Sequence, residues 1–337
     1  GLHQVVFPNS VFSKEAKEAQ TKRLVATQWA QPAIGVASLS QLRLLELLGV
    51  KPDCVAGHSF GEVTALHAGG VLTMEEMIQV ARKRGELMNE AAATPGAMIA
   101  VAAPIDDVRA ALPADSGVVV ANHNGPKQVV LSGRTEAIEA VAKTLKEGGM
   151  TVKRLSVATA FHSEVVSGAV GPFAEFLGSI ELSSPKLPVY ACSEAAPYPG
   201  NSKKIAAILS KQLANPIRFV EQIQAMYASG VRTFIEVGPG NVLTNLTSRI
   251  IDDASCRMIN LDQKGRDGVM SFHHGLARLA VAGLDLDFEK LWAAWANHTD
   301  PRDVQPAPLA IELNGTNYGK PYPPEGGAAA LEPEVQR

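Results

Sequence analysis

A nucleophile-elbow pattern occupies one short run of the sequence, Gly57-His58-Ser59-Phe60-Gly61-Glu62. Residues 52–56 before it predict a short buried strand, and residues 62–69 after it predict a helix. In such a strand-to-helix turn the serine takes a strained backbone conformation and presents its hydroxyl to substrate. The flanking glycines leave room for the turn, and N–H groups at the start of the helix could hold an oxyanion. Ser59 is therefore the candidate nucleophile.

A serine nucleophile needs a base within hydrogen-bond reach. His162 is the candidate base, and it follows Ser59 by 103 residues. It lies where a small predicted module returns to a larger domain, and a cleft between two such parts is a common place for a site. His58 is the rival base, but a residue adjacent to the elbow serine points its side chain elsewhere.

The composition sets limits on the class of protein. A chain of 337 residues with 46% hydrophobic residues can form one large domain or two moderate ones, and it lies far from the disordered range. A net charge of −3 and a pI near 6.3 give no reason to expect nucleic acid as a partner. Three cysteines form neither a disulfide framework nor a metal-ligand pattern, so no metal site is predicted. No membrane span or signal segment is visible, so we expect a cytoplasmic protein.

Most of the chain predicts alternating helices and strands. Residues 16–48 predict two helices broken near Gln31-Pro32, because proline disrupts a helix interior. Thr73 and Glu76 predict a capping box at the start of a later helix.

Residues 96–158 predict a separate small module. Its expected elements are strands at 97–103, 117–121, 128–132 and 152–157, and helices at 106–112 and 136–147. The order β-α-β-β-α-β is that of a ferredoxin-like module.

The larger domain is expected to comprise residues 1–95 and 159–300. Its later predicted elements are helices at 165–177, 205–214 and 219–228 and strands at 187–191 and 233–237. Residues from 305 onward are rich in proline, glycine and alanine, which is typical of a linker or surface strap. We therefore expect a linker at 301–337.

Further motifs accompany the elbow in a fixed order along the chain. They are Thr27-x-x-Ala30-Gln31-Pro32-Ala33, Arg84-Gly85-x-x-Met88, Gly96-Ala97-Met98, Asn122-x-Asn124-x-Pro126-x-Gln128-Val129-Val130, Phe161-His162-Ser163, Gln212-Leu213-x-Asn215-Pro216-Ile217-Arg218-Phe219 and Glu236-Val237-Gly238-Pro239-Gly240-x-Val242-Leu243. With these motifs, the chain from about Thr27 to Ile251 resembles the acyltransferase domains of fatty acid and polyketide synthases, the malonyl-CoA:acyl carrier protein transacylase family. The resemblance implies an α/β fold, with an α/β-hydrolase-like large domain and an inserted ferredoxin-like (β-α-β-β-α-β) subdomain.

The resemblance also implies catalytic roles. Ser59 would be acylated with His162 as its base, and the main-chain carbonyl of Gln212 would orient the imidazole in place of a carboxylate. Phe60 would supply a backbone N–H to the oxyanion. Arg84 would pair with the free carboxylate of a malonyl group, for which the planar guanidinium is suited. Without the resemblance, Arg84 is more simply interpreted as a solvated helix residue.

Other positions would form the acyl and pantetheine pocket of the family. The residues at these positions are Met88, Asn122, Asn124 and Val242. Phe161 resembles the bulky residue of malonyl-selective domains, where it narrows the space beside the malonyl α-carbon and so excludes larger donors.

The implied reaction moves a malonyl group from coenzyme A to the phosphopantetheine thiol of an acyl carrier protein, through a malonyl-serine intermediate. No permanently bound cofactor is implied. Three alternatives stay open: a serine hydrolase that releases stalled acyl groups, an acyltransferase for methylmalonyl or another donor, and a catalytically silent docking domain. Arg84 argues against the hydrolase, and intact Ser59 and His162 argue against the silent domain.

The chain departs from the family pattern in two places. Residues 1–13 contain no match to the family's Gly-Gln-Gly-Ser-Gln loop, which normally gives the oxyanion a second contact. We therefore expect that the chain is a fragment or that this part is supplied from upstream. Residues 190–194 differ from the Ser-Asn-rich turn common in the family, so the resemblance does not extend to this edge of the pocket.

The end of the chain carries two further resemblances. Residues 276–291 resemble the linker that follows acyltransferase domains in modular synthases, and residues 313–319 resemble polyunsaturated fatty acid synthases. We therefore expect one domain of a multidomain synthase. Its expected partners are an acyl carrier protein and an adjacent ketosynthase domain of the same polypeptide, with no nucleic acid and no membrane.

Overall fold

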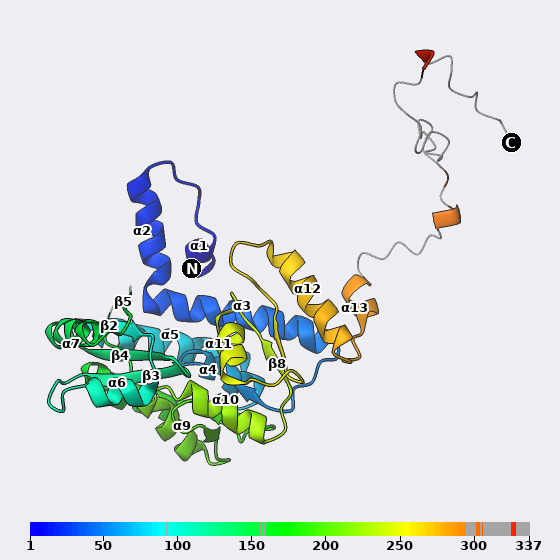
Figure 1. Cartoon of the computed structure of the whole chain (residues 1–337). Coiled ribbons are helices and arrows are strands. Elements are labelled where there is room, and N and C mark those ends of the chain that lie inside the picture. Colours follow the sequence, from blue (N-terminus) through cyan, green and yellow to red (C-terminus); the bar gives the residue numbers. More distant parts are fainter. Residues whose placement is uncertain are drawn as a thin grey trace. The chain divides into compact units, whose positions relative to one another are not determined.

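The computed structural model describes residues 1–91, 93–155, 157, 159–293, 301–303, 305 and 325–327. The chain divides into two compact units, Gly1–Leu291 and Trp292–Arg337. The first unit is mixed α/β, with helices packed around small sheets (Figure 1). Of the expected linker at 301–337, only η2 (Pro301–Asp303), residue 305 and residues 325–327 belong to the described residues. No helix of the described residues is long and apolar enough to cross a membrane.

The N-terminal helices differ from the expected pair. The helices concerned are α1 (His3–Val6), α2 (Lys14–Val25), α3 (Thr27–Leu47) and α5 (Met74–Ala91). The break expected near Gln31-Pro32 is wrong, because α2 ends before Ala26, whose backbone is extended (φ −64°, ψ 132°). Pro32 lies inside α3 and is buried, so packing outweighs the hydrogen bond that proline removes.

The start of α3 is fixed against α5. Thr27 Oγ1 donates a hydrogen bond to the main-chain oxygen of Gly85 at 2.9 Å. A Cβ on Gly85 would lie 2.5 Å from the main-chain oxygen of Thr27, so glycine permits this close approach. The capping box predicted at the start of α5 is confirmed. The Thr73 N–H donates to Glu76 Oε2 at 2.7 Å, and the Glu76 N–H donates to Thr73 Oγ1 at 3.2 Å.

A small sheet supports the elbow. Its strands are β1 (Val55–Ala56), β6 (Val189–Ala191) and β7 (Ala196–Pro197). β1 pairs in parallel with β6, and β6 pairs antiparallel with β7. The elbow joins β1 to α4 (Gly61–Ala68), whose residues Val63 and Leu66 are fully buried in the core. The predicted helix after Ser59 is therefore present, whereas the strand before it comprises only Val55–Ala56 of the expected 52–56 and is half-buried instead of buried.

A second sheet contains four antiparallel strands in the order β3-β4-β2-β5. Its elements in chain order are β2 (Gly96–Val101), α6 (Ile105–Ala111), β3 (Val119–Gly125), β4 (Gln128–Arg134), α7 (Thr135–Glu147) and β5 (Val152–Arg154). The predicted succession of strands and helices is confirmed. β3 starts and ends later than the expected 117–121, so Asn122 and Asn124 lie on the strand.

The remaining helices and one parallel strand pair follow β5 in the chain. These elements are η1 (Glu164–Ala169), α8 (Val170–Gly178), α9 (Ser202–Lys211), α10 (Phe219–Ala228), β8 (Thr233–Glu236), α11 (Val242–Ile250), β9 (Arg257–Asn260), α12 (Gly268–Val281) and α13 (Phe288–Trp292). The last residue of α13 begins the second unit. The predicted helix at 165–177 is in fact the 3-10 turn η1 followed by α8. β8 pairs in parallel with β9.

The four-stranded sheet is attached to the segment before α10. Asn122 and Ile217 form an isolated parallel bridge. The His123 N–H donates to the main-chain oxygen of Ile217 at 2.8 Å, and the Ile217 N–H donates to that of Ala121, also at 2.8 Å. Because Gln212 precedes this segment, the bridge brings β3 close to the residues expected to support the base.

Candidate active site

Ser59 occupies the strained position of the elbow. Its φ is 50°, in the left-handed region that non-glycine residues rarely adopt, so the predicted strain is confirmed. A Cβ on Gly57 would overlap main-chain atoms of Gly61 and Glu62, whereas a Cβ on Gly61 would meet no atom within 4 Å. The turn therefore needs glycine at position 57, and the expectation that both glycines make room holds for only one of them.

The fold brings His162 to the elbow. Ser59 Oγ and His162 Nε2 lie 2.9 Å apart. His162 Nδ1 lies 3.0 Å from the main-chain oxygen of Gln212 and 3.1 Å from that of Asn215. Carbonyl oxygens only accept hydrogen bonds, so Nδ1 carries the proton and Nε2 is the acceptor for the serine hydroxyl.

The surroundings of His162 keep its ring neutral. The side chain is buried, with 3% exposure. Burial, and next the positive charge of Arg84, lower the pKa of His162 to about 3. The imidazole is therefore uncharged at neutral pH and can take a proton from Ser59.

Arg84 is a buried part of the same cluster and not a solvated helix residue, since its exposure is only 1%. Its Nη1 donates to Gln31 Oε1 at 2.9 Å, and its Nη2 donates to Gln212 Oε1 at 2.8 Å and to Ser59 Oγ at 3.3 Å. Its Nε is buried and has no hydrogen-bond partner among the described residues. Burial lowers the pKa of Arg84 to about 10, so the guanidinium stays charged at neutral pH.

Phe60 directly follows Ser59 and caps the N-terminus of α4. The first N–H groups of a helix have no partner within the helix, so the Phe60 amide lies where an oxyanion could be bound. The Phe60 ring is buried and approaches Gly35.

His58 makes contacts that exclude it as the base. Its Nε2 lies 2.7 Å from Asn124 Oδ1, and its ring packs edge-on against Phe219 with ring centres 5.3 Å apart. Burial lowers the pKa of His58. The expectation that His58 points away from Ser59 is confirmed.

The other predicted pocket residues lie at different depths. Asn122 and Met88 are buried, and the Gln31 amide nitrogen lies 3.3 Å from Met88 Sδ. Phe161 is half-buried against two core clusters. Val242 begins α11 and is 64% exposed, so it lies outside the buried polar cluster. Its place in an acyl pocket stays a prediction.

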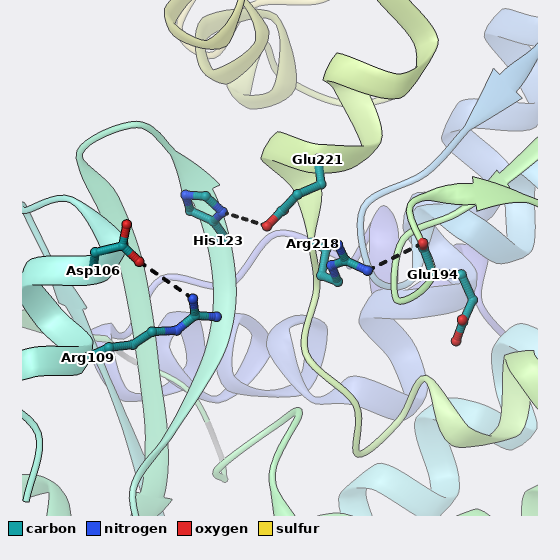
Figure 2. A network of polar contacts seen from close by, with 6 residues as sticks. All are labelled: Asp106, Arg109, His123, Glu194, Arg218 and Glu221. Carbon is teal, nitrogen blue, oxygen red and sulfur yellow. Dashed lines mark hydrogen bonds and ion pairs between the residues drawn. The ribbon is translucent and has the colours of Figure 1, made fainter.

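Two polar contacts hold β3 and the segment before α10 in place. Figure 2 shows His123 on β3 facing Glu221 on α10, with Nδ1 3.1 Å from Oε1. Arg218, just before α10, reaches the main-chain oxygen of Glu194 at 3.5 Å (Figure 2). The pairing of β3 with β4 is irregular between Val120 and Asn122 and between His123 and Gly125, so side chains do not simply alternate along this strand. The contact of His123 with Glu221 fixes the backbone of the strand that also carries Asn122 and Asn124.

Three buried residues of the cluster were not assigned roles from the sequence: Gln31, Glu62 and Tyr198. Gln31 supports Arg84, and Glu62 accepts a hydrogen bond from the Tyr198 hydroxyl. Gln31 and Glu62 belong to motifs that were identified in the sequence, so the sequence already indicated that these two positions lie near the site. Tyr198 lies in a segment with no such pattern. Among the described residues, no group of His, Cys, Asp and Glu is arranged to hold a metal ion.

The chain is similar to known proteins of one family. The acyl transferase domain family matches residues 3–286. A malonyl CoA-acyl carrier protein transacylase of Bacillus subtilis is 36% identical over 242 residues, covering 69% of this chain and 75% of that protein. A polyunsaturated fatty acid synthase protein of Thraustochytrium sp. is 29% identical over 324 residues, or 94% of this chain, and the chain spans only 11% of that much longer protein.

A solved structure shares the fold. The acyltransferase domain from the second module of the salinomycin polyketide synthase matches with a TM-score of 0.78 and 31% identity, covering 89% of this chain and 69% of that one. The family resemblance of the sequence motifs is thereby confirmed. The chain belongs to the acyl transferase domain family and is an acyltransferase.

Proposed function

We propose that this chain transfers a malonyl group from coenzyme A to the phosphopantetheine thiol of an acyl carrier protein through a malonyl ester of Ser59. The observation that carries the proposal is a buried guanidinium, Arg84, 3.3 Å from a serine hydroxyl that contacts a neutral histidine. The relatives, among them a malonyl CoA-acyl carrier protein transacylase, support the same donor and acceptor.

In the first half-reaction, Ser59 Oγ attacks the thioester carbon while His162 Nε2 takes the hydroxyl proton. The main-chain oxygen of Gln212 accepts from Nδ1 and stabilises the imidazolium that forms. The Phe60 N–H donates to the oxyanion. The bond from the carbonyl carbon to sulfur then breaks, and His162 Nε2 gives its proton to the sulfur, so that coenzyme A leaves as the thiol and His162 is neutral again.

Arg84 selects the donor. The Nε–H has no hydrogen-bond partner among the residues that the structure describes, and the Nη2 contact to Ser59 at 3.3 Å is weak. This edge of the guanidinium can therefore bind a carboxylate through Nε and Nη2, with loss of only the weak contact to Ser59. A buried guanidinium requires an anion to offset its desolvation, which an acetyl donor lacks.

In the second half-reaction, the pantetheine thiol of the carrier protein gives its proton to His162 Nε2 and attacks the carbonyl carbon of the malonyl ester. The bond from that carbon to Ser59 Oγ then breaks, and His162 returns the proton to Ser59 Oγ, so that both residues regain their starting forms. We propose an acyl carrier protein and an adjacent ketosynthase domain of the same polypeptide as partners. Phe161, half-buried near the site, would exclude donors with a substituted α-carbon, and Met88, Asn122, Asn124 and Val242 would border the acyl and pantetheine path.

We further propose the domain division 1–95 and 159–300 for an α/β-hydrolase-like domain, 96–158 for a ferredoxin-like subdomain and 301–337 for a linker. The β-α-β-β-α-β succession and the strand order β5-β2-β4-β3 support the ferredoxin-like assignment.

Intact-mass spectrometry after incubation with malonyl-CoA tests the proposal. The expected result is a malonyl adduct on the whole chain that is lost in Ser59→Ala. Ser132→Ala is the matched control, because this buried hydroxyl on β4 has no hydrogen-bond partner among the described residues and its removal should leave the adduct intact. A wild-type chain that takes no malonyl group, or an adduct that survives in Ser59→Ala, would overturn the proposal.

The acceptor is tested in a second step. Addition of a holo acyl carrier protein should move the malonyl group from Ser59 to the carrier faster than water removes it. Rapid loss of the adduct in buffer alone, with no transfer to the carrier, would instead identify a hydrolase.

A further inference from the structure

A network of buried, hydrogen-bonded polar groups leads from Tyr198 and Glu62 to Gln212. Tyr198 and Glu62 take no direct part in the proposed chemistry. The Glu62 side chain on α4 is completely buried, with 0% exposure. Its carboxyl group accepts hydrogen bonds from the Tyr198 hydroxyl and from the Cys192 N–H, the latter at 2.8 Å. A buried carboxyl group with strong donors on both oxygens is held in one orientation.

The network continues from Glu62 to Gln212, which is also fully buried. The amide nitrogen of Gln212 lies 2.7 Å from the main-chain oxygen of Ser59 and 3.4 Å from Glu62 Oε2. Its amide oxygen accepts from Arg84 at 2.8 Å, and its main-chain oxygen accepts from His162 at 3.0 Å. Gln212 therefore touches the nucleophile, the guanidinium and the base.

The orientation of the Gln212 side-chain amide is determined by the hydrogen-bond partners of its oxygen and its nitrogen. A guanidinium only donates hydrogen bonds, so the amide oxygen must face Arg84. The two amide hydrogens then need acceptors at the other end. Ser59 provides one main-chain oxygen, and the remaining acceptors are a Glu62 oxygen and the weakly accepting sulfur of Cys192, each at 3.4 Å. Glu62 thus completes the set of partners that holds the amide.

We propose that Glu62 and Tyr198 are positioning residues for donor recognition and for the base. Tyr198 holds Glu62, Glu62 holds the Gln212 amide, and Gln212 aims Arg84 at the donor carboxylate. By holding its own backbone in place, the Gln212 side chain also positions the main-chain oxygen of Gln212, which accepts the hydrogen bond from His162. This inference rests on the proposed malonyl transfer.

The consequence differs from that of a purely structural role. Loss of folded enzyme lowers the apparent kcat for every donor and leaves KM unchanged. A displaced Arg84 guanidinium weakens binding of a carboxylate-bearing donor specifically, so KM for malonyl-CoA should rise while KM for acetyl-CoA stays nearly constant.

Steady-state kinetics of Tyr198→Phe and Glu62→Gln with malonyl-CoA and acetyl-CoA test the inference. Tyr198→Phe removes one oxygen and keeps the ring, and we expect KM for malonyl-CoA to rise about 3- to 10-fold, a share of one hydrogen bond to a charged group. Glu62→Gln places an amide donor among groups that donate, and we expect a rise of about 10-fold or more. Tyr227→Phe is the matched control, since it also removes a tyrosine hydroxyl that donates to a carboxylate, that of Asp253 at 2.7 Å, and Tyr227 contacts none of Ser59, His162, Arg84 and Gln212 through that hydroxyl.

The outcomes separate this inference from the proposed function. If the wild-type chain forms no malonyl-serine, the proposed function fails. If wild type forms it and Tyr198→Phe keeps the wild-type KM for both donors, only the present inference fails. Equal changes for the two donors would also overturn it, because they would indicate a general structural role. Should Glu62→Gln not fold, Tyr198→Phe alone decides.

Discussion

The Arg84 guanidinium lies 3.3 Å from the Ser59 hydroxyl, within a single buried cluster. The group suited to a carboxylate and the atom suited to accept an acyl group therefore lie in contact with each other. This short separation fits a donor whose carboxylate is one methylene away from its thioester carbon. A longer diacid would have to fold back to reach both groups.

Replacing Arg84 with alanine should remove donor selectivity and leave Ser59 reactive. Losing one partner of a buried charge pair costs roughly 2–5 kcal/mol, so malonyl loading should fall about 30-fold or more. Acetyl loading should fall much less, because an acetyl group has no carboxylate to bind. Loading rates measured by intact mass with both donors check this.

Arg82→Ala is the control for that experiment. Arg82 lies on the same helix, but it is exposed and pairs with Glu86 at 2.7 Å. Its loss should leave both loading rates within about twofold, as expected for an exposed ion pair. A parallel loss with both donors in Arg84→Ala would show that Arg84 supports the fold and not the substrate.

Arg84→Ala should also change the pH dependence of acetyl loading. A general base acts when deprotonated, so the rate falls as the pH drops through the pKa of His162. In the wild type this pKa is about 3, and the positive charge of Arg84 is one of its causes. Removing that charge raises the pKa, so the acid limb of kcat/KM should move to higher pH. Acetyl-CoA is the donor to use because it carries no carboxylate that titrates at the site.

The measurement needs a check on folding at low pH. Circular dichroism at each pH identifies the range in which both proteins are folded, and only that range is compared. An acid limb that stays in place, or that moves to lower pH in Arg84→Ala, would contradict the assignment of His162 as the base under the influence of Arg84.

The elbow could be predicted from the sequence because its signal is local. Ser59, Gly57 and their flanking strand and helix are adjacent in the chain, and backbone sterics alone determine their arrangement. The capping box at Thr73 and Glu76 was predictable for the same reason. Pro32 was misinterpreted, because a local rule about proline was outweighed by burial against other helices, which local sequence does not reveal.

The supporting network could not be predicted in this way. Tyr198 lies 136 residues after Glu62, and Gln212 lies 128 residues after Arg84. Only the tertiary fold brings these polar groups together, and no spacing rule connects them. The family resemblance supplied Gln212 through its main-chain role. It gave no indication that the side chain of this residue also holds Arg84 and the backbone of Ser59.

Gly57→Ala should destabilise the chain strongly, while Gly61→Ala should be tolerated. The new Cβ at position 57 would overlap main-chain atoms, which cannot move without opening the elbow. We expect a loss of at least about 3 kcal/mol in the free energy of unfolding, at the upper end for overpacking. At position 61, on α4, the space is open and alanine favours the helix, so stability should be unchanged or slightly higher. Urea unfolding of both variants measures the difference, and equal stability of the two would contradict the observed elbow geometry.

Phe161→Ala should widen the donor range of the enzyme. The phenyl ring is half-buried and packs against two core clusters, so its removal should open space next to the place proposed for the acyl group. A closely fitting pocket discriminates between donors that differ by one methyl group by about 1–3 kcal/mol. Removing the ring should therefore let the methyl group of methylmalonyl fit and raise the methylmalonyl-to-malonyl ratio of kcat/KM about 10-fold or more. Phe161→Leu keeps most of the apolar contact and should give a smaller shift. Competition assays with both donors, analysed by the mass of the Ser59 adduct, report the ratio directly. If both donors lose rate in proportion in both variants, Phe161 contributes packing alone, and the selection of malonyl must depend on other residues of the pocket.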